Sequence, residues 1–267
     1  MDLLRQDEQL DDLQLNGLKI IQKKSGFCFG VDAVLLANFV KSKKDATVVD
    51  LGTGTGIISV LINAKSNVKK IYAVEIQERI ADMAKRTMHL NNMSDKIEVM
   101  NINLKDTCKY LQKQSVDIVV SNPPYMQKEK LTSPNEMQRI SRNEIFCDID
   151  DVMSTASELL KFGAKMYMVH RPTRLCDILV AARKHDLEPK QMRMVYPRLG
   201  KPANLVLLSF TKNAKSELKM LEPLFIHEQD GSYTKEVRDI YDKKTLEFES
   251  DMDINGETFT ACKMNTI

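Results

Sequence analysis

The sequence predicts an α/β fold, in which a mostly parallel sheet carries helices on both faces. From residue 46 onward, short β-branched apolar runs alternate strictly with helical patterns. A glycine-rich turn follows the first of these runs, and four of the runs end in or just before polar residues, namely Asp50, Glu75, Asn103 and Asn122. Parallel strands end at one edge of a sheet, so these side chains are expected to converge on a single crevice.

The residues before the alternating region are expected to form a helix, a short extended segment and a second helix. Residues 3–24 predict a short helix followed by a strand or turn, and residues 31–40 have apolar positions at helical spacing. The loop between them contains Phe27 and Phe29. Together with Asp32, these aromatics are placed to wall a pocket at the glycine turn, although they fit the hydrophobic core equally well.

The alternating region defines the sheet and its helices. The predicted strands cover 46–51, 71–75, 97–101, 116–121 and 164–169, and the predicted helices cover 57–65, 77–92, 106–113 and 148–161. A further helix is expected at 171–185. Two strands then follow at 190–196 and 203–211, and the turn at 197–202 between them favours antiparallel pairing at the sheet edge.

The C-terminal part adds an apolar run at 224–227, a turn at 230–232 and a short helix. From residue 244 the chain has five acids against two lysines and few apolar positions, which is typical of a mobile tail. The predicted division is an N-terminal segment over the pocket (1–45), a core (46–212), an appendage (213–243) and an acidic tail (244–267).

Composition excludes several classes of protein. The 267 residues contain no apolar run near membrane-spanning length, so no membrane association and a cytoplasmic location are expected. The five cysteines and four histidines are scattered, which disfavours both a disulfide framework and a metal site. Net charge is +2, but residues 165–201 hold nine Lys and Arg against three acids. This excess favours a polyanionic partner, although solvated helix faces explain it as well.

The glycine turn at 48–56 reads Val-Val-Asp-Leu-Gly-Thr-Gly-Thr-Gly, which departs from the G-x-G-x-x-G spacing of dinucleotide sites. Asp50 would repel a pyrophosphate and suits an amino-bearing ligand. Glu75, after the next strand, is placed to accept hydrogen bonds from both ribose hydroxyls. These features favour S-adenosylmethionine over a nicotinamide cofactor. The alternative without any ligand is a glycine turn that only packs the helix against the strand.

The second informative stretch is Asn122-Pro123-Pro124-Tyr125, directly after the strand at 116–121. The two prolines stiffen the loop, which leaves the Asn122 side-chain oxygen and the Pro123 carbonyl free to accept hydrogen bonds. Two such acceptors fit the N–H groups of a planar amine, and Tyr125 offers a face for stacking a flat base or amide. The alternative is a plain loop with a packed tyrosine.

Together, the glycine turn and this tetrapeptide resemble class I S-adenosylmethionine-dependent methyltransferases that act on an exocyclic or amide nitrogen. Residues 27–37, 75–79, 140–145 and 169–175 match motifs of one branch, which is similar to bacterial tRNA N6-adenine methyltransferases that modify adenosine 37 of a valine tRNA. The similarity runs from about residue 10 to 241. It implies a Rossmann-like fold, with a seven-stranded, mostly parallel sheet and one antiparallel edge strand.

The resemblance also assigns residues to roles. Asn122, Pro123 and Tyr125 would hold the target adenine. Those implied to bind S-adenosylmethionine are Phe29, Asp32, Asp50, Gly52, Gly54, Glu75, Ile76, Asn103, Leu104 and Asn122. Two positions depart from the family pattern. Asn103 stands where relatives often have Asp, and Asn143 stands where they often have His.

The expected partner is tRNA, and a monomer is favoured. The basic residues expected on the rim of the crevice are Lys128, Lys130, Arg139, Arg142, Arg171, Arg174, Arg198 and Lys201. The competing functions are N5-methylation of a glutamine in a translation factor, N-methylation of an rRNA base such as guanine N2, and RNA binding without catalysis. The basic stretch favours an RNA substrate, and the chain is too short for the target-recognition domain of a DNA enzyme.

Overall fold

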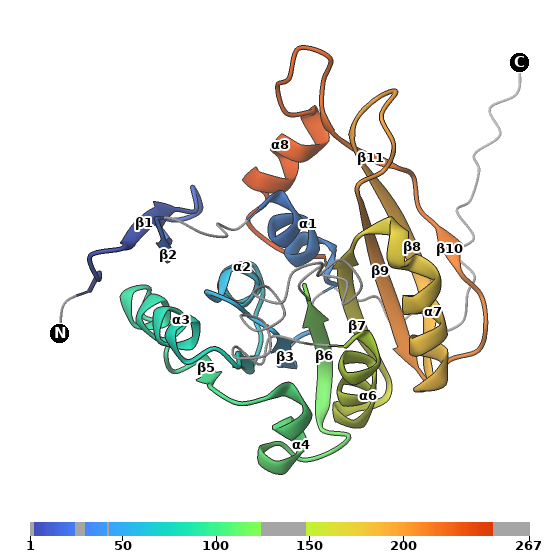
Figure 1. Cartoon of the computed structure of the whole chain (residues 1–267), viewed down its shortest axis with the longest axis horizontal. Coiled ribbons are helices and arrows are strands. Elements are labelled where there is room, and N and C mark those ends of the chain that lie inside the picture. The colour runs from blue at the N-terminus through green and yellow to red at the C-terminus, as the bar shows by residue number, and fades with distance from the viewer. Residues whose placement is uncertain (1–2, 25–29, 42, 124–147, 248–267) are drawn as a thin grey trace, which may run out of the picture.

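The computed structural model describes residues 3–24, 30–41, 43–123 and 148–247. Within them, the strands of the main sheet follow the order β10-β8-β9-β7-β6-β3-β4-β5, and β11 also pairs with β8 (Figure 1). Their bounds are β3 Thr47–Leu51, β4 Lys70–Val74, β5 Ile97–Met100, β6 Val116–Ser121, β7 Leu160–His170, β8 Leu187–Arg198, β9 Leu205–Lys212, β10 Lys219–Met220 and β11 Leu224–His227. Strands β5, β4, β3, β6 and β7 are all parallel, as the alternating pattern predicts.

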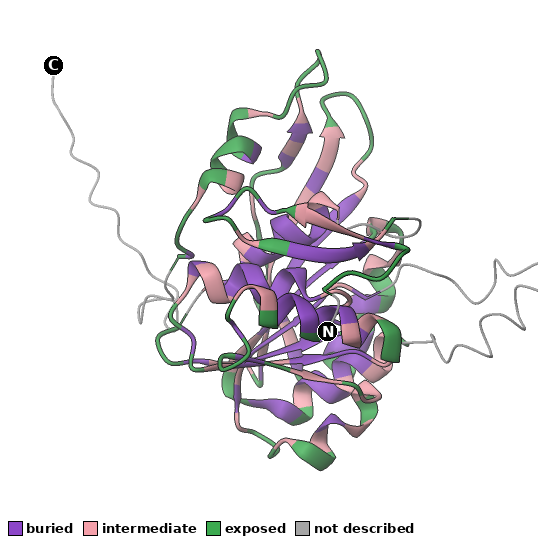
Figure 2. Cartoon of the chain, turned by 90° about the vertical axis from the view of Figure 1, so that its left-hand side faces the viewer, coloured by how far each residue is buried: buried purple, intermediate pink, exposed green. Residues whose placement is uncertain are grey.

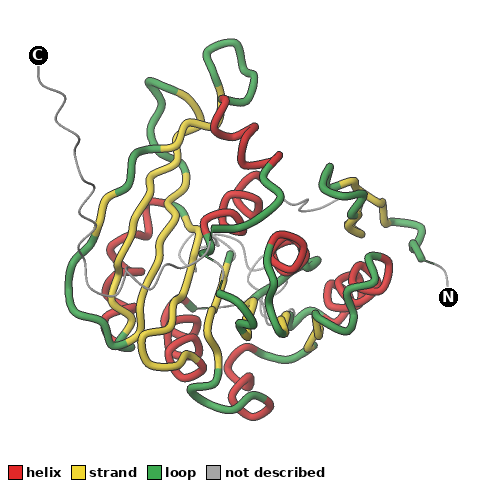
Figure 3. The backbone as a smooth tube through the Cα atoms, turned by 180° about the vertical axis from the view of Figure 1, so that it is seen from behind, coloured by secondary structure: helices red, strands yellow, loops and turns green. Residues whose placement is uncertain are grey.

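The α/β fold is confirmed, but the sheet differs in detail from the expected seven strands. Two short strands, β10 and β11, pair with β8, so the sheet has nine strands among the described residues. The antiparallel strand β9 lies inside the sheet, between β7 and β8, rather than at its edge. Because β8 and β9 form a hairpin in which β9 pairs with β7, β8 takes the outer position and offers its free side to the appendage. Figure 3 shows the three long strands β7, β9 and β8 running side by side.

Helices cover both faces of the sheet. They are α1 Val31–Phe39, α2 Ile57–Lys65, α3 Glu78–Leu90, α4 Thr107–Tyr110, α6 Ile149–Leu159, α7 Leu175–Lys184 and α8 Lys235–Asp242. Neighbouring residues of β3 point to opposite sides: Val48 joins the hydrophobic cluster beneath α1 and α2, and Val49 joins the cluster beneath α6 and α7. Figure 2 shows the buried residues concentrated along the strands and the helix faces that pack on them.

Most of the predicted elements are present. The predictions at 57–65 and 116–121 match α2 and β6 residue for residue. The predicted helix at 106–113 is instead a 3-10 turn, Leu104–Asp106, followed by the single turn of α4. Likewise, a 3-10 turn, Pro172–Arg174, precedes α7.

The prediction of a helix in the first 24 residues is wrong. Strand β1, Glu8–Asp12, pairs antiparallel with β2, Lys19–Lys23, in a separate two-stranded sheet. The connection turns through left-handed backbone at Gln14, Asn16 and Gly17, which buries the intervening leucines of the turn. The apolar spacing that suggested a helix therefore belongs to a hairpin whose leucines reach the core.

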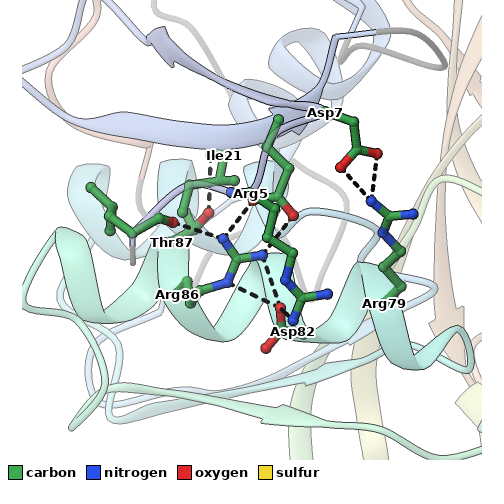
Figure 4. A network of polar contacts seen from close by, with 9 residues as sticks. Arg5, Asp7, Ile21, Arg79, Asp82, Arg86 and Thr87 are labelled. Atoms are coloured by element: carbon green, nitrogen blue, oxygen red, sulfur yellow. Dashed lines mark hydrogen bonds and ion pairs between the residues drawn. The ribbon is translucent and has the colours of Figure 1, made fainter. Parts of the chain in front are cut away.

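The hairpin is held on α3 by a buried ion pair. Arg86 of α3 donates to both carboxylate oxygens of Glu8, at 2.6 and 2.8 Å. It also donates to Asp82 on the same helix (Figure 4). The Glu8 side chain is fully buried, and its hydrogen bond from Arg86 holds its pKa below the usual range. Beside it, the Thr87 hydroxyl accepts the Ile21 N–H at 3.1 Å.

The last described residues also reach the core. Leu246 is buried, and its N–H donates to the carbonyl of Lys65 at the end of α2. The remainder of the predicted acidic tail, 248–267, lies outside the described residues. Over the described part of the chain, none of the helices combines the length and the apolar character that crossing a membrane requires.

Replacing Glu8 by Gln is expected to lower the free energy of unfolding by about 2–3 kcal/mol. The change leaves Arg86 buried with only Asp82 as a charged partner, so the loss falls below the ~3–5 kcal/mol of a fully broken buried pair. Asp7→Asn is the matched control, because Asp7 and Arg79 form an exposed pair worth about 0–1 kcal/mol. Urea denaturation measures both, and equal midpoints for the two variants would contradict the assignment.

Candidate active site

Four neighbouring strands end at one edge of the sheet, and each delivers a polar side chain there. Asp50 is the penultimate residue of β3, Glu75 directly follows β4, and Asn122 directly follows β6. Asn103 lies three residues beyond the end of β5. Strands β5, β4, β3 and β6 are adjacent and parallel. The four polar residues at their carboxyl ends therefore lie along one edge of the sheet, as the sequence predicts.

The glycine turn joins β3 to α2 through three residues in left-handed backbone. The φ angles are 77° at Gly52, 59° at Gly54 and 92° at Gly56. A Cβ added at Gly52 or Gly54 would meet no atom of the described residues within 4 Å, so nothing in this part of the chain fills the space beside these two glycines. A Cβ at Gly56, in contrast, would overlap the Met88 side chain of α3. Gly56 therefore serves helix packing, a role that the spacing of the motif did not reveal.

Asp50 is fully buried beneath this turn. Its Oδ2 accepts hydrogen bonds from Thr53 Oγ1 at 2.6 Å and from Ser59 Oγ at 2.8 Å, while Oδ1 has no hydrogen-bond partner among the described residues. Burial, with a smaller contribution from the charge of Glu75, raises the pKa of Asp50 to about 6. A buried acceptor without a partner is expensive in free energy, and a cationic or amino-bearing ligand would satisfy it.

The carboxylate of Glu75 is held by two backbone N–H groups, one of which belongs to the glycine turn. Its Oε2 accepts the Gly54 N–H at 3.1 Å, its Oε1 accepts the Gln77 N–H at 2.9 Å, and burial raises its pKa. The following peptide is held by Asn101, whose amide donates to the carbonyls of Glu75 and Ile76. Sequence reasoning missed Asn101 as a site residue, and its only signal was a polar side chain just after β5.

Asn103 uses its side chain locally. Its Oδ1 accepts the Lys105 N–H at 3.0 Å and so caps the 3-10 turn that begins at Leu104. The cap fixes the half-buried segment 102–104 at the same edge as Glu75. Asn at this position is therefore well suited to the local backbone, whatever it contributes to a ligand.

The end of β6 is joined to the start of α1. Asn122 Nδ2 donates to Asp32 Oδ2 at 3.1 Å, and Asp32 Oδ1 accepts the Ala33 N–H at 2.9 Å. Asp32 and Pro123 are buried, whereas Asn122 is half-buried. Phe29 and Tyr125 lie outside the described residues, as do Asn143 and the basic residues Lys128, Lys130, Arg139 and Arg142.

A comparison with known protein families identifies the family to which the chain belongs. Residues 27–173, more than half of the chain, match the family model described as the methyltransferase small domain. The chain belongs to the methyltransferase small domain family. The match begins just before α1 and runs past β7, so it includes every strand that delivers a polar residue to the edge.

Several curated relatives of this methyltransferase share one description, tRNA1(Val) (adenine(37)-N6)-methyltransferase. The relative from Phocaeicola vulgatus is 29% identical over 181 residues, which is 68% of this chain and 75% of the relative. The relative from Bacteroides thetaiotaomicron is 26% identical over 232 residues, which is 85% of this chain and 96% of the relative. A third, from Trichodesmium erythraeum, is 26% identical over 229 residues, 83% of this chain and 94% of the relative.

Solved structures share the fold of this methyltransferase. A predicted O-methyltransferase from Agrobacterium tumefaciens superposes with a TM-score of 0.67 at 22% identity, covering 82% of this chain and 99% of that one. TYW2 of P. horikoshii, in complex with MeSAdo, superposes with a TM-score of 0.56 at 16% identity, covering 79% of this chain and 73% of that one. At these identities, the likeness concerns the fold alone.

The basic stretch of this methyltransferase contains residues paired with acids and residues that lie near the strand edge. Arg183, Lys184 and Arg193 form ion pairs with acids, so they contribute little unbalanced charge. Arg198 ends β8, and Lys201 lies in the exposed turn after it. Strand β8 runs in the same direction as β7, because both are antiparallel to β9. This turn therefore lies at the same edge of the sheet as Asn122.

Arg171 and Arg174 follow β7 at the same edge. Arg171 donates to the carbonyl of Asn204, and Arg174 pairs with Asp177 at 2.6 Å. Among the described residues, no group of three or more His, Cys, Asp and Glu side chains is placed to hold a metal ion. The expectation of a metal-free site stays a prediction.

Exchanging Gly56 for Ala is expected to destabilise the protein more than exchanging Gly54 for Ala. Both changes place a side chain at positive φ, which costs about 1 kcal/mol. Only the Gly56 variant also meets another side chain, the buried terminal methyl group of Met88, and because this flexible end can shift, the additional cost is about 1 kcal/mol, the low end of overpacking. Urea denaturation of the two variants measures the difference. Equal losses would contradict the close approach of α2 and α3 at this residue.

Proposed function

We propose that the chain is an S-adenosylmethionine-dependent methyltransferase that methylates the N6 amine of adenosine in tRNA. Adenosine 37 of a valine tRNA is the proposed target, since the curated relatives are described by that activity. The observation that carries the proposal is the position of Asn122. Its side-chain amide stands at the end of β6, next to the turn that contains Gly52 and Gly54, with its Nδ2 already engaged by Asp32.

The residues around the glycine turn fit S-adenosylmethionine. Asp50 Oδ1, buried and without a partner among the described residues, would face its amino group. Without a side chain at Gly52 and Gly54, the amino-acid part of the cofactor could lie close to the backbone of the turn. The carboxylate of Glu75, which the N–H groups of Gly54 and Gln77 hold in place, has lone pairs left to accept from the ribose hydroxyls.

The remaining residues proposed to contact the cofactor surround these three. They are Phe29, Asp32, Ile76, Asn103, Leu104 and Asn122. When bound, the cofactor supplies a methyl group on a positively charged sulfur, which makes that carbon electrophilic.

The chain's own contribution to catalysis is positioning. Asn122 Oδ1 and the Pro123 carbonyl would accept the two N–H groups of the adenine amine, and Tyr125 would stack on the ring. These contacts favour a more pyramidal N6 and aim its lone pair at the methyl carbon. With the cofactor held by these residues, N6 would attack its methyl carbon as the C–S bond breaks, the electron pair of that bond would stay on sulfur, and the extra N6 proton would leave to water.

The surface proposed to receive tRNA is the rim of this edge. Arg171, Arg174, Arg198 and Lys201 would contact phosphates, as contacts of this kind fix the register of a nucleic acid on a protein. We further propose that the enzyme is monomeric, needs no metal and works in the cytoplasm, where its substrate is found.

Replacing Asn122 by Ala is expected to reduce methyl transfer severely while the cofactor still binds through its other contacts. The change removes one of the two acceptors that orient the amine, at a cost of about 100-fold or more in rate. The assay follows label from S-adenosylmethionine into bulk tRNA, translation factors free of RNA, and DNA. Asn67→Ala, in the exposed loop between α2 and β4, is the matched control.

The acceptor of the label distinguishes the competing functions. Transfer to tRNA alone, in wild type and in the control variant, supports the proposal. Label that enters protein would favour glutamine methylation and overturn the adenosine assignment.

Cofactor affinity is expected to depend on pH through Asp50. Without ligand its pKa is raised to about 6, whereas a bound ammonium group favours the ionised carboxylate. Binding below pH 6 must therefore release a proton, so affinity falls by up to about tenfold per pH unit and is level above pH 6 to 7. Calorimetry between pH 5 and 7.5 measures this.

Methylthioadenosine, which lacks the amino-acid part, is the control ligand. Its affinity should change less over the same range, because any pH dependence through Glu75 and the ribose is common to both ligands, and the same holds for S-adenosylmethionine with the Asp50→Asn variant. Parallel pH curves for the two ligands would argue against a contact between Asp50 and the amine.

A further inference from the structure

We propose that Thr53 and Ser59 are positioning residues that hold the carboxylate of Asp50 by one oxygen, Oδ2, and so make a proton and the amino group of the cofactor compete for the other oxygen, Oδ1. The inference rests on the proposed function, because it concerns how the site receives S-adenosylmethionine. It assigns a task to two hydroxyl groups that act through Asp50.

Both hydroxyl groups donate to the same carboxylate oxygen. Thr53 Oγ1 lies 2.6 Å from Asp50 Oδ2, and Ser59 Oγ lies 2.8 Å from it. A hydroxyl group has one proton and an ionised carboxylate can only accept, so each hydroxyl proton points to Oδ2. The two hydroxyl oxygens are 3.4 Å apart, which is too long for a contact between them to compete.

The two donors belong to backbone that is itself fixed. Thr53 lies in the glycine turn, where its N–H donates to the carbonyl of Val74 in β4 at 2.9 Å. Ser59 is the third residue of α2, and the N-terminus of a helix favours a negative charge. Both residues are buried. The carboxylate of Asp50 is therefore held between the glycine turn and the start of α2.

The other oxygen of Asp50 is the one that a ligand could use. Asp50 is fully buried, and its Oδ1 has no hydrogen-bond partner among the described residues. Because Oδ2 already accepts from two donors, a proton that neutralises the carboxyl group is favoured at Oδ1. An ammonium group needs the same oxygen as its acceptor. Protonation and amine binding therefore exclude one another at a single atom.

The two hydroxyl groups also favour the ionised form of Asp50. Burial raises its pKa to about 6, and the hydrogen bonds from Thr53 and Ser59 oppose this rise. The charge of Glu75, after β4, adds a smaller increase to the pKa. The residues opposite Asp50 on β4 and β6 are uncharged, and the first turn of α2 contains no acid. Removing either hydroxyl group should therefore raise the pKa of Asp50 further.

The test compares two ligands by calorimetry between pH 5 and pH 8. They are S-adenosylhomocysteine and methylthioadenosine, which lacks the amino-acid part. The ratio of their affinities isolates the amino-acid contact, because pH dependence through Glu75 and the ribose is common to both. In wild type the ratio should be level above about pH 7 and fall by up to about tenfold per pH unit below pH 6.

Thr53→Val and Ser59→Ala each remove one hydroxyl donor. A hydrogen bond to a charged group is strong enough that its loss should move the fall in the ratio upward by about one pH unit. At pH 6.5 the ratio should therefore be about threefold lower than in wild type, and most of this loss should disappear at pH 8. Thr53→Ser keeps the hydroxyl group and should restore the wild-type curve.

Ser121→Ala is the matched control. Ser121 is also a fully buried serine at this edge of the sheet, but its hydroxyl donates to the Leu51 carbonyl at 2.8 Å instead of to a carboxylate. The variant removes a buried hydroxyl group without changing the contacts of Asp50. Its affinity ratio should follow the wild-type curve.

Each outcome decides between the proposals. Wild type that binds neither ligand at any pH overturns the proposed function. Wild type that binds both, with a ratio that is level down to pH 5, overturns the competition at Oδ1. If the ratio falls as expected but Thr53→Val and Ser59→Ala follow the wild-type curve, or lose affinity equally at every pH, the role of the hydroxyl groups is overturned and the proposed function stands. Should Thr53→Val fail to fold, Ser59→Ala decides, because alanine is favoured within a helix.

Discussion

The parallel pairing of β3 with β6 is the constraint on which the site depends. Its register places Asp50 opposite Val120 and Leu51 opposite Ser121, and the Ser121 hydroxyl donates to the Leu51 carbonyl at 2.8 Å. A shift of one residue would turn every side chain of a strand to the other face. The parallel direction therefore brings the buried acid under the glycine turn and the amide after β6 to the same edge, and the register sets the face of the sheet to which each side chain points.

Function and stability pull in opposite directions at this edge. Asp50 is buried with one oxygen unpartnered among the described residues, and burial raises the pKa of both Asp50 and Glu75. Such groups weaken a fold unless a ligand completes their contacts. Away from the edge, the sheet carries apolar clusters on both faces, and the Glu8–Arg86 ion pair anchors the N-terminal hairpin. A rigid scaffold thus supports side chains arranged for a partner.

The sequence patterns predicted those elements whose conformation depends on interactions between residues close together in the chain. The glycine turn, the helix at 57–65, the strand at 116–121 and the polar residues at strand ends all follow from short stretches of sequence. Contacts between distant residues could not be predicted in this way. Arg86 holds Glu8 across 78 positions and so anchors the hairpin that stands where a helix was expected, and Asp32 meets Asn122 across 90 positions. Nothing in the local sequence around Gly56 indicates that Met88 packs against it.

The central claim is that one strand edge holds both the methyl donor and the flat amine that receives the methyl group. A crystal structure of the protein with bound S-adenosylmethionine tests it most directly. The account predicts the amino-acid part beside Asp50, the ribose on Glu75, and the methyl group facing Asn122 across a gap that fits one amino group. A donor bound away from the turn between β3 and α2, or with its methyl group directed away from Asn122, would contradict it.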